Sequence, residues 1–145
     1  MAVSYASNWN NIIKALMSKI KAEMKCPVFS DWNDVTKTNQ FVKLTPVGSM
    51  QGDVTRISEH RTFNINMQFF FIDRKNRKFQ EHVLDRCDIL ESLIHDNQTL
   101  TLSDSTVAYN LLIGDLDMTT SPEEDYGDYV IADWDFSCEH LNNFG

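Results

Sequence analysis

Four aspartates in the C-terminal part of the chain have a spacing from which a metal site could be built. Asp115 and Asp117 are two residues apart, and so are Asp133 and Asp135. Alternate residues of a strand share one face, so two neighbouring strands would present four carboxylates together. Carboxylate oxygens are ligands of divalent cations, and such sites can cleave phosphoesters.

The surrounding sequence favours a plainer interpretation of these acids. A phosphoester-cleaving site usually adds a basic side chain for the transition state, but residues 87–145 contain no Lys or Arg. Rows of acids commonly solvate the outer face of a sheet. We therefore expect no metal and no other cofactor, and we keep a metal-dependent phosphoesterase as the alternative from another functional class.

Other catalytic signatures are missing from the sequence. The glycine-rich nucleotide motifs, the nucleophile elbow and the zinc-protease motif do not occur. The four histidines are scattered without ligand spacing and are expected at the surface or at helix ends: His60, His82, His95 and His140. We predict that the protein is not an enzyme.

Charge is distributed very unevenly along the chain. Up to Arg86 there are 13 basic and 8 acidic residues, a balance of +5, whereas residues 87–145 contain 13 acids and no base, a balance of −13. Four basic residues gather around the start of the second predicted helix and are expected to form a solvated turn rather than a phosphate site: Arg74, Lys75, Arg77 and Lys78. The chain therefore has two parts of opposite charge.

Length and cysteine content indicate one soluble domain covering residues 1–145. A chain of this length buries enough surface for a core without disulfides. The cysteines number three and lack the C-x-x-C spacing, so reduced thiols in a protein made in the cytoplasm are expected. The N-terminus does not resemble a signal peptide, and no apolar run approaches the length of a membrane span. We expect no membrane partner.

Two stretches have the apolar spacing of amphipathic helices, and five have the character of strands. Residues 9–24 and 77–95 repeat apolar side chains every three or four positions, and Asn97 is a typical helix stop. The predicted strands are 40–47, 61–73, 98–102, 107–118 and 130–140.

The remaining segments are predicted as connections. Residues 26–40 are expected to form a loop, and residues 121–128 a turn. Residues 48–60 contain two glycines and few large apolar side chains, so a long, mobile hairpin loop is expected there. Its candidate docking residues are Gly48, Met50, Gly52 and Arg56.

Residues 61–73, RTFNINMQFFFID, present one apolar face and one uncharged polar face. The apolar face is expected to pack on the two helices, and the face with Asn64, Asn66 and Gln68 to point outward. The predicted fold is an α+β two-layer sandwich, in which a mainly antiparallel sheet of about four to five strands packs against two amphipathic helices.

The order of elements resembles that of the tail terminator (tail-completion) proteins of long-tailed bacteriophages. The resemblance covers residues 9–140 and rests on FVKLTP, a polar loop, EHRTFNINMQFF with its Glu59-His60 pair, and FQEHVLDRCDILESLIHD. It implies a virion protein of the tail or neck without catalytic activity. It also implies a homo-oligomeric ring, commonly of about six subunits, that binds the tail tube protein on one side and a neck or connector protein on the other. A head-to-tail connector or another neck component is the alternative within this class.

A ring built from head-to-tail contacts needs two different, complementary surfaces on each subunit. Amide side chains can hydrogen-bond across such a contact without burying charge. The candidates for subunit contacts are Asn64, Asn66, Gln68, Phe70, Arg74, Lys75, Arg77, Lys78, Tyr126 and Tyr129. The acids Asp115, Asp117, Asp133 and Asp135 are candidates for the channel lining, because an acidic wall repels phosphates and lets DNA pass without specific binding.

Overall fold

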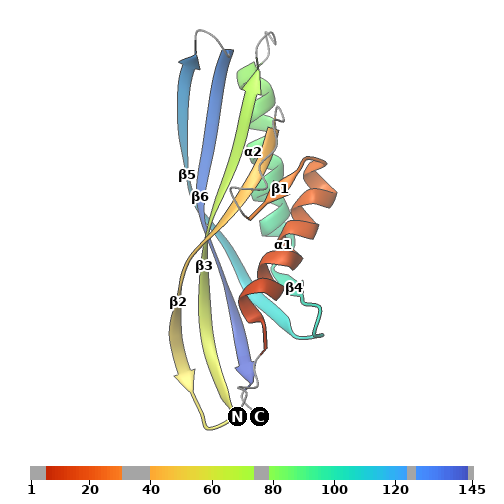
Figure 1. The fold of residues 1–145 in the computed structure, drawn as a ribbon, viewed down its shortest axis with the longest axis vertical. Coiled ribbons are helices and arrows are strands. Elements are labelled where there is room, and N and C mark those ends of the chain that lie inside the picture. Colours follow the sequence, from red (N-terminus) through yellow and green to blue (C-terminus); the bar gives the residue numbers. More distant parts are fainter. Residues whose placement is uncertain (1–5, 31–39, 74–78, 124–126, 144–145) are drawn as a thin grey trace.

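A computed structural model describes residues 6–30, 40–73, 79–123 and 127–143. They form two helices and six strands: α1 (Asn8–Met24), β1 (Val28–Phe29), β2 (Gln40–Val54), β3 (Ser58–Asp73), α2 (Phe79–Asp96), β4 (Thr99–Thr101), β5 (Val107–Glu123) and β6 (Gly127–Asn143). Both helices lie on the same side of the sheet (Figure 1). None of the helices in this described part of the chain is long and apolar enough to cross a membrane.

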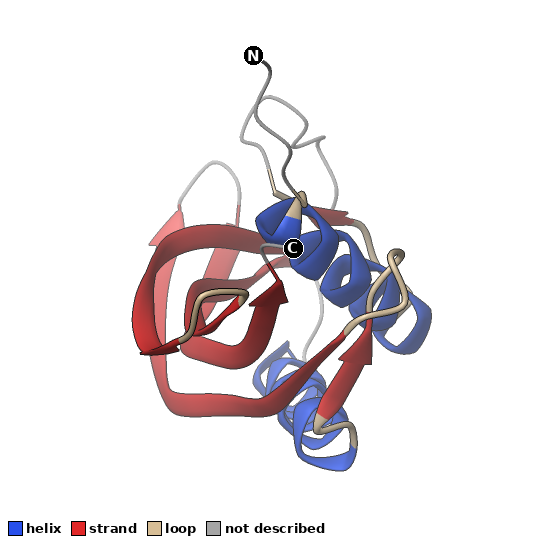
Figure 2. Cartoon of the chain, turned by 90° about the horizontal axis from the view of Figure 1, so that it is seen from below, coloured by secondary structure: helices blue, strands red, loops and turns tan. Residues whose placement is uncertain are grey.

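The strands form one sheet in the order β1-β2-β3-β6-β5-β4. All neighbours are antiparallel except β1 and β2. The long strands coil strongly, as Figure 2 shows from below. The α+β class is as predicted, but the sheet has six strands instead of four to five. The additional strand is β1, in the segment predicted as a loop, and its two residues are too few for an alternating pattern to show in the sequence.

The inner face of β3 forms the centre of the core, as the alternating pattern predicts. Its apolar side chains are 0–7% exposed: Phe63, Ile65, Met67, Phe69 and Phe71. The predicted stripe of α1 is also buried, from Ile12 to Met24. α2 ends at Asp96, and the Asn97 side chain donates to the carbonyl oxygen of Leu93 at 2.9 Å, so the predicted helix stop is confirmed.

The prediction of a long loop over residues 48–60 is wrong. β2 and β3 stay paired as far as Val54 and Glu59, which leaves a turn of residues 55–57. Of the candidate docking residues, Gly48, Met50 and Gly52 lie in β2 and Arg56 lies in the turn. The hairpin extends beyond the helices (Figure 1), and residues 50–57 are all exposed, so no apolar period shows in the sequence. Backbone pairing with β3 keeps the segment extended.

The predicted turn over residues 121–128 is also too long. β5 continues to Glu123 and β6 begins at Gly127. The β5–β6 hairpin and the β2–β3 hairpin therefore end at opposite ends of the elongated sheet (Figure 1).

Candidate functional site

Two amide side chains on the outer face of β3 bind one carboxylate of β6. Asn66 Nδ2 donates to Asp133 Oδ1 at 2.5 Å, and Gln68 Nε2 donates to Asp133 Oδ2 at 3.0 Å. Hydrogen bonds to a charged acceptor are roughly twice as strong as neutral ones. The outward direction of the amide face is as predicted, but these donors already serve a contact within the subunit. Their role between subunits stays a prediction.

A row of polar residues crosses the sheet at the level of this contact, and it begins with Lys43 of β2. Lys43 of β2 is opposite Gln68, Gln68 is opposite Asp133, and Asp133 is opposite Asp117. Directly opposite residues of antiparallel strands share a face. Lys43 is only 1% exposed. It was not predicted as a site residue because it is far from the acids in sequence, although its alternation with apolar neighbours in FVKL indicated an outward direction.

The four aspartates do not converge on one point. Asp117 and Asp133 are opposite each other, but Asp115 lies in a bulge where β5 shifts its register against β6. Asp115, Asp117 and Asp135 are exposed, whereas Asp133 is half-buried. Within residues 6–30, 40–73, 79–123 and 127–143, no group of three or more His, Cys, Asp or Glu side chains is placed to hold a metal ion. The arrangement is that of a negatively charged outer face.

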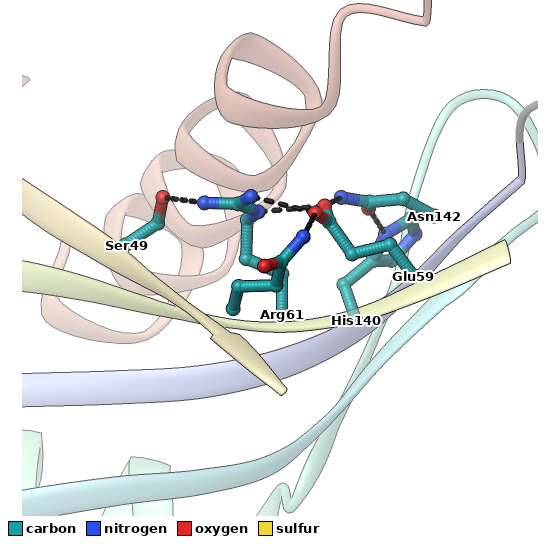
Figure 3. A network of polar contacts seen from close by, with 6 residues as sticks. Ser49, Glu59, Arg61, His140 and Asn142 are labelled. Atoms are coloured by element: carbon teal, nitrogen blue, oxygen red, sulfur yellow. Dashed lines mark hydrogen bonds and ion pairs between the residues drawn. The ribbon is translucent and has the colours of Figure 1, made fainter. Parts of the chain in front are cut away.

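A second group of polar side chains lies near the β2–β3 turn and centres on Glu59 (Figure 3). Arg61 donates to its carboxylate through Nε and Nη2, both at 2.6 Å. Gln51 Nε2 adds a bond of 2.8 Å, and Asn142 Nδ2 adds one of 3.1 Å. Arg61 Nη1 also donates to Ser49 Oγ at 2.9 Å. These donors, Arg61 first, lower the pKa of Glu59 from 4.5 to about 2.

The group continues through His140 to the connection between β4 and β5. His140 Nδ1 lies 2.6 Å from Asn142 Oδ1, and its Nε2 lies 2.9 Å from Thr106 Oγ1. Thr106 Oγ1 donates to Asp104 Oδ1 at 2.6 Å, and this bond contributes most to the lowered pKa of Asp104. His140 is 2% exposed, so its expected place at the surface is wrong. The network was not predicted because its members are spread over residues 49–142.

Glu59 predicts a definite pH dependence of stability. Because its pKa is lowered on folding, its stabilising effect is complete above about pH 4.5 and is lost as the pH falls toward about 2. Glu59→Gln is therefore expected to be less stable than the wild type near pH 7, and this deficit should shrink steadily in acid. Urea unfolding across that range measures it, with Glu23→Gln, an exposed site on α1, as the control for net charge. A deficit that is constant down to the acid limit would contradict the prediction.

Both long hairpins leave a strand edge open. β1 pairs only with Val42 and Lys43 of β2, and β4 pairs only with Val107–Tyr109 of β5. In the described part of the chain, the rest of these two edges has no neighbouring strand. The edges lie on opposite sides of the sheet and carry exposed apolar side chains: Val47 (67%), Met50 (65%) and Val54 (53%) on β2, and Leu112 (63%) and Met118 (41%) on β5. Such edges readily pair with another chain.

The remaining predicted contact residues fall into two groups. Phe70 points outward as expected and stacks on Phe41 of the same subunit, with ring centroids 4.7 Å apart. Tyr129 lies in β6, opposite Ile72. Outside the described residues lie Arg74, Lys75, Arg77, Lys78 and Tyr126.

No protein-family model matches the chain, and no curated protein matches its sequence. Among solved structures, a chain in the virion of a native gene transfer agent (GTA) particle has a similar fold, with a TM-score of 0.56. The similarity covers 97% of this chain and 99% of that chain, at 12% sequence identity. A second solved chain has a TM-score of 0.46 at 13% identity, over 94% of this chain and 92% of its own, which is too low a score to establish a common fold. At these identities the comparison shows a shared fold.

Proposed function

We propose that the protein is a structural component of a phage-like virion, and more specifically a tail terminator. In this proposal about six subunits form a ring on the end of the tail tube. The ring joins the tube to a neck or connector protein, and DNA passes through its opening. The observation that carries the proposal is the fold shared with a chain of the gene transfer agent virion over nearly the whole length of both chains.

The two open edges support a ring. A cyclic assembly repeats one head-to-tail contact, which requires two different surfaces on opposite sides of each subunit. The β2 edge and the β5 edge meet this requirement, and both expose apolar side chains that a contact would cover. In the proposed contact, the β2 edge of one subunit pairs with the β5 edge of the next, so that the sheets run on around the ring.

The outer face supports a passage for DNA. The helices cover the other face of the sheet (Figure 1), so a ring of continuous sheets can turn the outer face toward its opening. Asp115, Asp117 and Asp135 are exposed on these strands. Acids on the wall repel phosphates and keep DNA from binding there.

Electron microscopy of particles made without the protein tests the proposal. Absence of a tail terminator is expected to leave heads and tails unjoined, and the tubes unequal in length because nothing caps their growth. Purified protein added to such tails should appear as a ring at one end of each tube. Binding to tailless heads instead would support the alternative of a connector, and normal joined particles would reject both.

A further inference from the structure

A groove of about 600 Å³ runs between α1 and β4, apart from the two open edges and the acidic face. Lys14, Ser18 and Lys19 line it from α1, and Thr99 and Thr101 line it from β4. This volume is within the range of known ligand pockets. α1 and β4 lie beside each other in the fold (Figure 1).

A hydrogen bond joins the two sides of the groove. Ser103 Oγ donates to Asn11 Oδ1 at 3.2 Å, and both residues line the groove. Asn11 belongs to α1 and Ser103 follows β4, so this bond links the two segments that line the groove.

The backbone of β4 presents hydrogen-bonding groups to this groove. The Leu102 N–H donates to Thr106 O, and Gln98 O accepts from the Leu111 N–H. Residues 98 and 102 thus point their backbone groups at β5, and hydrogen-bonded positions of an antiparallel strand recur every second residue. The N–H and C=O groups of Thr99 and Thr101 consequently point away from β5. β4 is the terminal strand of the described sheet.

The charge of the groove is positive. Its lining includes Lys14 and Lys19, and all its other lining residues are uncharged. Lys14 is exposed and Lys19 is half-buried. A segment with carboxylates therefore gains electrostatic attraction along α1, while its backbone can pair with β4.

We propose that this groove binds an extended acidic segment of a partner protein, which adds to β4 as a further strand. Strand addition takes its affinity from main-chain hydrogen bonds and its specificity from the flanking side chains. β4 has only three residues and is flanked by α1, so a short free segment fits, whereas the long hairpin edges of a second folded copy do not. The proposal concerns a surface separate from the ring contact and does not depend on the ring.

Nuclear magnetic resonance of the isotope-labelled full chain tests the groove with a defined probe. The probe is acetyl-Thr-Glu-Val-Glu-Val-amide, and its counterpart with Lys in place of Glu is the control. We expect saturable shifts of the backbone amides of Thr99 and Thr101 and of the facing residues of α1, and much weaker shifts with the control peptide. Equal shifts with both peptides, or none at these amides, would overturn the proposal.

Two pairs of variants separate charge from backbone pairing. Lys14→Glu is expected to weaken binding about fivefold, whereas Lys21→Glu, on the same helix but outside the groove lining, should change it less than about twofold. Thr101→Pro removes the N–H that faces the groove and keeps the pairing with β5, so it should abolish saturable binding, while Thr101→Ser should preserve it.

Dispersed spectra of each variant establish that it is folded before binding is measured. Binding that survives Thr101→Pro in a folded variant would overturn the proposed strand addition. If the groove amides shift with protein concentration alone, a second copy is the occupant, and the proposal of a partner segment is wrong.

Discussion

Replacing Val47 and Met50 together with aspartate is expected to prevent ring assembly and leave the subunit folded. Both side chains are more than 60% exposed on the open edge of β2, so the subunit core does not depend on them. In the proposed contact they are covered by the β5 edge of the next subunit. Each buried charge without a partner costs at least about 1–3 kcal/mol, and a ring repeats this cost at every contact.

The effect of these substitutions on assembly should depend on the sign of the introduced charge. The β5 edge carries Asp115 and Asp117, so aspartate on β2 adds repulsion to the loss of apolar contact, whereas lysine adds attraction. The double lysine variant is therefore expected to assemble better than the double aspartate variant at low salt, and high salt should reduce the difference.

Incorporation into particles is the measurement, because the ring needs the tail tube in the proposed assembly. Each variant is supplied to particles made without the protein, and the fraction of joined head–tail particles is counted. Leu84→Asp is the control, since Leu84 is 42% exposed on α2, away from both edges. If the double aspartate variant is incorporated as well as the wild type, the β2 edge is not part of the subunit contact.

Sequence patterns predicted the fold best where one face of an element is buried. The stripe of α1 and the alternation of β3 follow directly from their contact with the core. The β2–β3 hairpin was predicted wrongly because its outer half is solvated on both sides: residues 50–57 are all exposed. Hydrogen bonds between backbone groups keep such a segment extended, and these bonds do not require a particular pattern of side chains.

The polar contacts were harder to predict, because they depend on register. The amide face of β3 was recognised, but its partner Asp133 is 65 residues away from Gln68. The Glu59 network likewise joins β2, β3 and β6. A shift of one residue in either pairing would turn these side chains to the other face, so only the paired sheet identifies the partners.

The strand pairing also determines which aspartates can be replaced without disturbing the folded subunit. Asp133 accepts hydrogen bonds from two half-buried amides, so its removal takes an acceptor from each, although Asn66 Nδ2 keeps the carbonyl oxygen of Trp134 at 3.3 Å, and the subunit itself is altered. Asp115, Asp117 and Asp135 are exposed and can be changed with little effect on folding. These three acids are therefore the ones to replace in a test of the proposed channel.

Replacing these three aspartates with lysine is expected to block DNA passage in assembled particles. Each change moves the local charge from −1 to +1, and the ring repeats all three in every subunit. Basic side chains hold phosphates through counterion release, so the wall would bind the DNA it is proposed to repel. We expect infectivity per joined head–tail particle to fall by about 100-fold or more.

The matched control carries asparagine at the same three positions. It removes the repulsion without adding attraction, and is expected to stay within about threefold of wild type, because a repulsive wall acts through its summed potential. Release of DNA from purified particles, followed with a fluorescent dye, separates passage from assembly.

One combination of results would favour the metal-dependent phosphoesterase over the structural function. A metal site fails when a single ligand is lost, whereas a charged wall does not. If Asp117→Asn alone abolishes function in a folded subunit, and Mg²⁺ or Mn²⁺ raises the melting temperature of the wild type, the acids serve as metal ligands. If only the lysine variant fails, and high salt restores DNA release, the acids act through charge, as the proposed channel requires.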